Sequence, residues 1–354
     1  MPFLPLIGHD ALRERLDAQV ARGALPASLL LTGAPGIGKQ RLALWLGQRL
    51  LCEAPGAPCG TCQQCSYALQ GGHPDLRWYF PRPRLKDSSD IALEEVAREY
   101  AEAIAERSAA HGLYPRADGS QAIYVYVARL IVQQAVRTPA MARRKVFVVG
   151  DAERMVPQLS SQEAANAFLK LLEEPPADTT IILTSSEPGA LLPTIRSRVV
   201  NVRVAPLADA AVREFLAQPQ AAAAAGGGAS MDELVLMAHG APGALIGAAT
   251  VGVALERART LLDAAQRGRE AIMRAAFVQS SSKARGQFAD VLDAMTVVLH
   301  ERARHAARTG DARSAAASAR AVRFVEEAKR AAEGNASPQL VSARLLGQMA
   351  EVRA

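Results

Sequence analysis

The sequence has no long apolar run and few aromatic residues. None of its hydrophobic stretches reaches the roughly 18 residues that a membrane span needs, and no charged-then-apolar leader is present. We therefore expect a cytoplasmic protein with no membrane partner. Aromatic residues make up 5% of the chain, which disfavours binding of single-stranded nucleic acid by stacked rings.

Cysteine is equally scarce, and all the cysteines lie close together in the sequence. They are Cys52, Cys59, Cys62 and Cys65, in the spacing C-x6-C-x2-C-x2-C. Disulfides are disfavoured because a cytoplasmic chain keeps its thiols reduced and has no other cysteine to pair with. Four thiolates at this spacing can instead surround one tetrahedral Zn²⁺, in a closed site with a structural role. We expect a zinc module over residues 51–66, with an iron–sulfur cluster as the main rival centre.

Charge and length set broad limits on the partners and on the domain count. The formal net charge of +6 permits a polyanionic partner such as nucleic acid but does not require one. The 354 residues exceed what a single core usually organises, so we expect two or three domains.

Alternating apolar runs and amphipathic segments predict the fold class. Strands alternate with helices as far as residue 204, which predicts an α/β domain with a parallel sheet over residues 1–205. Residues 206–250 look like a small helical domain, in which the alanine- and glycine-rich residues 218–230 predict a flexible loop. Residues 251–354 show no clear strand and predict a separate all-helical domain.

A glycine-rich loop predicts a nucleotide site in the first domain. Residues 33–40 read GAPGIGKQ, follow an apolar strand and open an amphipathic helix, which is the setting of a phosphate-binding P-loop. The glycines of the loop are Gly33, Gly36 and Gly38. Their backbone would face a phosphate, and Lys39 would reach the outer phosphates. Gln40 stands where a hydrolysing enzyme has the Ser or Thr hydroxyl that binds Mg²⁺.

A second nucleotide motif is also incomplete. The apolar strand over residues 146–149 leads to Asp151, which is the Walker B pattern in which the acid organises Mg²⁺ and its water. The next residue, Ala152, lacks the carboxylate that polarises the attacking water, and Glu153 is displaced by one position. We expect no Mg²⁺-dependent hydrolysis. Weak binding of ATP or ADP through Lys39 and the loop, and no binding at all, both stay open.

Further segments complete a set of motifs that occur together in one family. They are residues 166–176 (NAFLKLLEEPP), Ser197-Arg198 and residues 337–340 (SPQL). With the P-loop and the four cysteines, they resemble the AAA+ clamp-loader subunits of bacterial DNA polymerase III. The resemblance implies an AAA+ P-loop domain with an inserted zinc module, a helical lid and a C-terminal collar used in oligomerisation. It covers most of the chain and is weakest over residues 80–120, where we expect an insertion.

Departures from the family pattern distinguish between two kinds of subunit. Gln40 replaces the magnesium hydroxyl, Ala152 replaces the catalytic Glu, and Gly243 stands where the family's sensor-2 arginine contacts the γ-phosphate. With these three losses, the site resembles that of the non-hydrolysing delta prime subunits. The alternatives are an ATP-hydrolysing motor subunit, similar to gamma/tau, and a zinc-ribbon nucleic-acid binder with a vestigial P-loop.

The resemblance also implies partners and a role for one arginine. The implied assembly is a heteropentamer with motor subunits and a delta subunit, which opens the sliding clamp and places it on primed DNA. Arg198 matches the arginine of the family's Ser-Arg-Cys motif, which acts on a neighbour's γ-phosphate as an arginine finger. Val199 replaces the Cys and leaves the charged group intact. Apart from the resemblance, Arg198 is a surface arginine before a strand, and Ser186, at the sensor-1 position, is interpreted as a strand-end cap.

Overall fold

The chain forms two compact units. The computed structural model describes residues 2–85, 91–115, 121–155, 162–225, 229–246, 251–278, 285–333 and 336–351. One unit comprises Met1–Phe215 and Gly240–Ile246, and the other comprises Leu216–His239 and Gly247–Ala354. Among the described residues, no helix has the length and apolarity to cross a bilayer.

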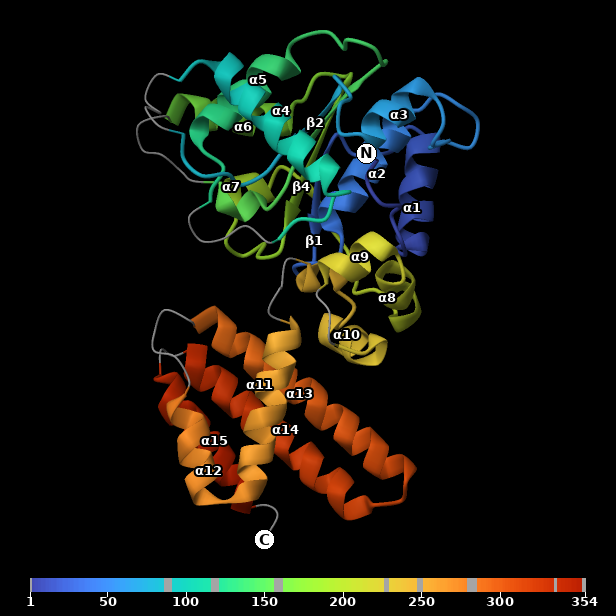
Figure 1. Cartoon of the computed structure of the whole chain (residues 1–354). Helices are drawn as coiled ribbons and strands as arrows, with labels where there is room; N and C mark the ends of the chain where they lie inside the picture. The colour runs from blue at the N-terminus through green and yellow to red at the C-terminus, as the bar shows by residue number, and fades with distance from the viewer. Residues whose placement is uncertain are drawn as a thin grey trace. The chain divides into compact units, whose positions relative to one another are not determined.

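A parallel sheet forms the core of the first unit. Its strands are β1 (Ser28–Thr32), β2 (Leu76–Tyr79), β3 (Lys145–Val149), β4 (Thr179–Ser185) and β5 (Val200–Arg203). They lie in the order β2-β3-β4-β1-β5, and every neighbouring pair is parallel (Figure 1). Every residue of β1, β3 and β4 is buried, as expected for strands covered on both faces. The predicted α/β class is confirmed for this unit.

Helices supply the crossovers that parallel strands require. They are α1 (Asp10–Ala21), α2 (Lys39–Leu51), α3 (Gln63–Leu69), α4 (Leu93–Ala109), α5 (Val125–Ala135), α6 (Gln162–Glu173), α7 (Pro193–Arg196) and α8 (Asp209–Leu216). The described residues of this unit also form the 3₁₀ turns η1 (Ala152–Arg154) and η3 (Pro242–Leu245). The helix α2 joins β1 to the cysteine-rich segment, so the P-loop and the four cysteines lie at opposite ends of one helix.

The second unit is helical throughout its described residues. Its helices are α9 (Pro219–Ala224), α10 (Met231–Ala238), α11 (Val251–Arg267), α12 (Arg269–Phe277), α13 (Arg285–Arg308), α14 (Ala312–Glu333) and α15 (Pro338–Glu351). The helices α11–α15 form the orange-to-red bundle of Figure 1. The prediction of a flexible loop over residues 218–230 is wrong for α9, because Pro219 starts a helix and alanine is the strongest helix former. Residues 226–228 of that prediction lie outside the described residues.

Candidate functional site

The glycine-rich loop lies where the sequence predicts, between β1 and α2. Gly36 and Gly38 adopt positive φ angles of 80° and 90°, a backbone region that residues with a Cβ rarely enter. Gly38 is the N-cap of α2, and Lys39 is the first residue of that helix. The loop therefore has the backbone turn and the helix N-terminus that a phosphate site uses.

Lys39 does not extend from this loop toward a ligand. Its ammonium donates to the carbonyl oxygens of Gly33 at 2.9 Å and Ala34 at 2.8 Å, and to the hydroxyl of Ser186 at 2.9 Å. A lysine ammonium has three N–H donors, so these three contacts use all of them. The side chain is 5% exposed. In the structure, Lys39 thus joins the loop to the residue that follows β4.

Gln40 fills the space between the start of α2 and the end of β3. Its amide nitrogen donates to Asp151 Oδ2 at 3.1 Å. Its amide oxygen accepts from Trp78 Nε1 at 3.0 Å and from the Tyr114 hydroxyl at 3.1 Å. A Cβ placed on Gly150 would lie 2.3 Å from the same oxygen, so a side chain at position 150 would displace the Gln40 amide from these contacts.

Two of the residues around Gln40 are Tyr114 and Arg107. Sequence reasoning missed both, because they lie in the segment interpreted as an insertion. The Arg107 guanidinium lies 3.6 Å from the ring centre of Tyr114, 3.3 Å from that of Phe80 and 4.7 Å from that of Trp78. Burial lowers the Arg107 pKa to about 10, which leaves the side chain charged at neutral pH. Part of residues 80–120 therefore packs against the nucleotide-binding motifs. The only signal in the sequence was the tyrosine and arginine content of this segment.

The acidic residues after β3 also make intramolecular contacts. Burial and the neighbouring carboxylate of Glu153 raise the Asp151 pKa, although Lys39 and Arg107 oppose the shift. Glu153, on η1, accepts from the backbone N–H of Ser186 at 3.0 Å. Its other carboxylate oxygen is buried without a hydrogen bond among the described residues. Glu153 thus binds the end of β4, and Ser186 joins it to Lys39, which fits the interpretation of Ser186 as a strand-end group.

Gly243 lies directly against the P-loop. Its backbone N–H donates to the carbonyl oxygen of Gly36 at 2.9 Å. A Cβ on Gly36 would be 2.4 Å from the Ala244 nitrogen, and a Cβ on Gly243 would be 2.8 Å from the Gly36 oxygen. Neither position has room for a side chain, so an arginine at 243 would force this contact apart.

Arg198 lies just before β5, a strand at one edge of the sheet. Its Nε donates to Glu173 Oε2 at 2.9 Å, and its NH1 donates to the Thr194 carbonyl at 3.0 Å. The Arg198 side chain is 31% exposed. Val200, two residues further on, pairs with Leu29 near the start of β1. Arg198 therefore lies near the amino ends of the strands, whereas its own P-loop follows their carboxyl ends.

The four cysteines converge as predicted. The Cys52 sulfur lies 3.7 Å from Cys59 and 3.8 Å from Cys62, and the Cys59 and Cys65 sulfurs are 3.9 Å apart. A tetrahedral ion with bonds of about 2.3 Å to sulfur requires sulfur–sulfur edges of about 3.8 Å. The N–H groups of Cys62 and Thr61 lower the Cys59 pKa to about 6, whereas burial raises the Cys65 pKa to about 12. The cluster fits a tetrahedral metal ion.

Comparison with known proteins gives a match over the first unit. The family model described as "DNA polymerase III, delta subunit" matches residues 8–208. DNA polymerase III subunit delta′ of Pseudomonas aeruginosa is 34% identical over 218 residues, and that of Escherichia coli is 30% identical over 187 residues. These matches cover 60% and 52% of this chain, and 52% and 44% of the relatives. The chain thus spans about half the length of the curated relatives that it matches.

More distant similarities extend to other subunits and to solved structures. DNA polymerase III subunit tau of Salmonella typhimurium is 26% identical over 218 residues, which cover 60% of this chain and 27% of that protein. A solved gamma subunit-related protein of Thermotoga maritima is 18% identical, with a TM-score of 0.40, over 96% of this chain and 99% of that one.

Proposed function

The chain belongs to the DNA polymerase III delta subunit family, among the clamp-loader subunits named delta prime, and we propose that it is a non-hydrolysing subunit of the clamp loader. In this role it helps to load the sliding clamp onto primed DNA beside motor subunits and a delta subunit in a heteropentamer. The observation that carries the proposal is Gln40, whose amide binds Asp151 where a hydrolysing site holds Mg²⁺.

The contacts around the P-loop support a site that works without nucleotide. All three Lys39 donors bind protein oxygens, and the backbone of Gly243 and Ala244 lies against Gly36. A nucleotide phosphate would have to break these contacts and would gain no Mg²⁺ ligand from residue 40. The AAA+ fold is retained in this proposal as a platform, and ATP, ADP and Mg²⁺ have no required place in it.

The chemistry that the chain contributes comes from Arg198. The arginine lies away from its own P-loop, is partly exposed and is attached to Glu173 by an ion pair that is also exposed. Ion pairs of this kind contribute only about 0–1 kcal/mol, so Arg198 is free to change partner when a subunit docks. We assign it as an arginine finger that stabilises the γ-phosphate charge during ATP hydrolysis by a neighbouring motor subunit.

The test is ATP turnover by a reconstituted loader on primed DNA. We expect Arg198→Ala to fold and assemble but to reduce turnover by about 10³-fold or more at the site that it serves, the usual effect of losing such a finger. Arg196→Ala removes an exposed arginine two residues away and should leave turnover unchanged. Equal turnover in the Arg198→Ala and wild-type assemblies would refute the finger.

The isolated chain separates the remaining alternatives. The subunit proposed here should show no ATP turnover of its own. Robust turnover that Lys39→Ala abolishes would establish the gamma/tau-like motor subunit instead. Tight DNA binding by the cysteine module, with no change in the loader's activity on its removal, would support the nucleic-acid binder.

We propose that the ion of the cysteine cluster is a structural Zn²⁺. A four-sulfur site is coordinatively closed and leaves no position for substrate. We expect metal analysis of the purified protein to give one zinc per chain. Cys62→Ser should lower the zinc content and the protein's thermal midpoint, whereas Ser66→Ala, within the helix that Cys62 caps, should change neither. Iron with an absorbing sulfide cluster in the wild-type protein would contradict the assignment.

A further inference from the structure

A surface pocket lies at the end of α2 that is remote from the P-loop. Its apolar side is formed by Val20, Leu25 and Leu50, and its rim carries Glu53, Arg143 and Arg144. Its volume is about 250 Å³. The thirteen residues of α2, at about 1.5 Å each, separate it from the nucleotide motifs by roughly 20 Å. The pocket is therefore separate from the nucleotide motifs.

The loop that presents the rim arginines, residues 136–144, is held by a buried carboxylate. Asp75 is 3% exposed and accepts the backbone N–H groups of Ala140 at 2.6 Å, Met141 at 2.8 Å and Ala142 at 2.8 Å. Burial opposes ionisation of Asp75, but these donors outweigh it and lower the pKa. The carboxylate therefore stays charged at neutral pH and fixes the centre of the loop.

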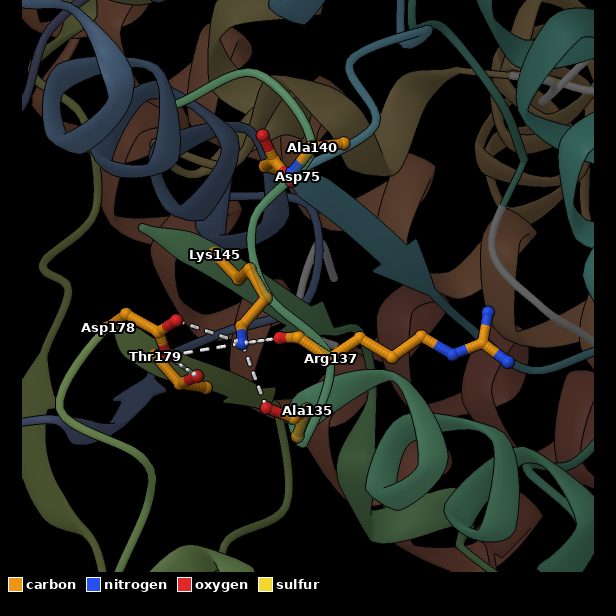
Figure 2. A network of polar contacts seen from close by, with 7 residues as sticks. All are labelled: Asp75, Ala135, Arg137, Ala140, Lys145, Asp178 and Thr179. Carbon is orange, nitrogen blue, oxygen red and sulfur yellow. Dashed lines mark hydrogen bonds and ion pairs between the residues drawn. The ribbon is translucent and has the colours of Figure 1, made fainter. Parts of the chain in front are cut away.

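A buried lysine holds both ends of the same loop. Lys145 is 5% exposed, and its ammonium donates to the carbonyl oxygens of Ala135 and Arg137 and to the Asp178 carboxylate (Figure 2). Buried charges are costly unless their hydrogen bonds are satisfied. Here the loop supplies the three donors to Asp75, and Lys145 donates to Ala135, to Arg137 and to Asp178. Two buried charges thus anchor this loop by hydrogen bonds at its centre and at its ends.

The loop is also joined to the cysteine module. Gln64, on α3, donates to the Met141 carbonyl at 3.2 Å, and its amide oxygen contacts the ring of His73. The Arg143 guanidinium pairs with Glu53, the residue after Cys52, at 2.9 Å. The metal-binding segment and the arginine loop therefore form the pocket rim together.

We propose that this pocket docks an acidic peptide segment of a partner protein, with one apolar side chain inserted between Val20, Leu25 and Leu50. The positive charge of the rim is the reason for proposing an acidic partner. The Arg143 side chain is 86% exposed, and Arg144 makes no ion pair among the described residues. Glu53 is the only acid of the lining and is already paired, so the rim has a positive excess. An acidic peptide complements the positive rim. A nucleic-acid backbone would also be attracted by the rim, but it has no apolar side chain to fill the apolar side of the pocket.

Fluorescence anisotropy with a synthetic probe tests the proposal. The probe is a fluorescein-labelled peptide of eight residues, with leucine and phenylalanine at its centre and aspartates on both sides. We expect the full chain to bind it, and Arg144→Glu to weaken binding about tenfold or more. Arg98→Glu makes the same charge change on the exposed face of α4 and should alter affinity less than twofold.

Two further probes separate peptide docking from simple charge attraction. A peptide with serine in place of leucine and phenylalanine should bind about tenfold more weakly, because the apolar side of the pocket is then unused. A labelled DNA duplex should show no dependence on Arg144. The proposal would be overturned if Arg144→Glu and Arg98→Glu weakened peptide binding equally, or if the two peptides bound with equal affinity. DNA binding that depends on Arg144, without peptide binding, would also overturn it. None of these outcomes bears on ATP turnover by the loader.

Discussion

Gln40 shows how a single side chain can join residues from distant parts of the chain. A serine or threonine hydroxyl at this position is short and leaves room for a cation, whereas the longer amide reaches three partners from distant parts of the chain. The loss of the hydroxyl is readable from the sequence. The partners are not, because Trp78 and Tyr114 are separated from residue 40 by 38 and 74 positions and only the folded sheet brings them together.

Removing this amide should destabilise the first unit. Gln40→Ala leaves the Trp78 N–H and the Tyr114 hydroxyl without their acceptor in a buried site, at a cost of about 1–3 kcal/mol for each unpaired group. We expect the free energy of unfolding to fall by about 2–4 kcal/mol, measured by urea denaturation. Gln70→Ala removes an exposed amide that donates to the Ser66 hydroxyl, and it should change the free energy of unfolding by less than about 0.5 kcal/mol. Equal effects would mean that the Gln40 contacts carry no net stability.

At the scale of elements, the apolar runs predicted β1 and β3, which, like β4, are buried from end to end. The strand β2 escaped prediction, because Pro74 precedes it and the exposed Arg77 interrupts a run of only four residues. Its place at the edge of the sheet explains both features, since edge strands tolerate polar positions. The predicted cysteine cluster formed because its ligands are close in sequence and need no distant partner.

The loop between α5 and β3 gives a prediction with a defined pH dependence. Asp75→Asn keeps the side-chain shape but places an NH₂ donor against backbone N–H donors. We expect the free energy of unfolding at pH 7 to fall by about 2–3 kcal/mol. In the folded protein the Asp75 pKa lies below the usual value of 3.8. The greater free energy of unfolding of the wild-type protein is therefore fully present above pH about 4.

That advantage should disappear as the pH falls through the folded pKa, because the protonated carboxyl also loses its charge-assisted hydrogen bonds. Urea denaturation of both proteins between pH 7 and pH 3 measures the difference. Asp10→Asn, whose carboxylate is 75% exposed and pairs with Arg13, should show a difference below about 0.5 kcal/mol throughout. If the difference in free energy of unfolding between Asp75→Asn and wild type were constant with pH, the carboxylate charge would be irrelevant to the loop.

At the scale of the whole chain, the change from alternating strands to helices predicted where the sheet ends, but it could not predict which helices pack together. The sequence divides the helical part at residue 251. In the structure, α10 lies against α13, and Leu234 and Val235 of α10 are buried. Glu233, also on α10, pairs with Arg259 of α11. These contacts place α10 in the second unit, although composition alone gives no sign of them.

Truncation should reveal this arrangement. We expect a fragment of residues 216–354 to unfold cooperatively, and a fragment of residues 251–354 to be less stable by about 3 kcal/mol. The shorter fragment exposes the surface that Leu234 and Val235 cover, and each such side chain contributes about 1.5–3 kcal/mol when buried. Urea denaturation followed by circular dichroism measures both. A fragment of residues 240–354 keeps the connecting segment but lacks α10, so it should match the shorter fragment. If all three were equally stable, the helical domain would begin at residue 251, as the sequence predicts.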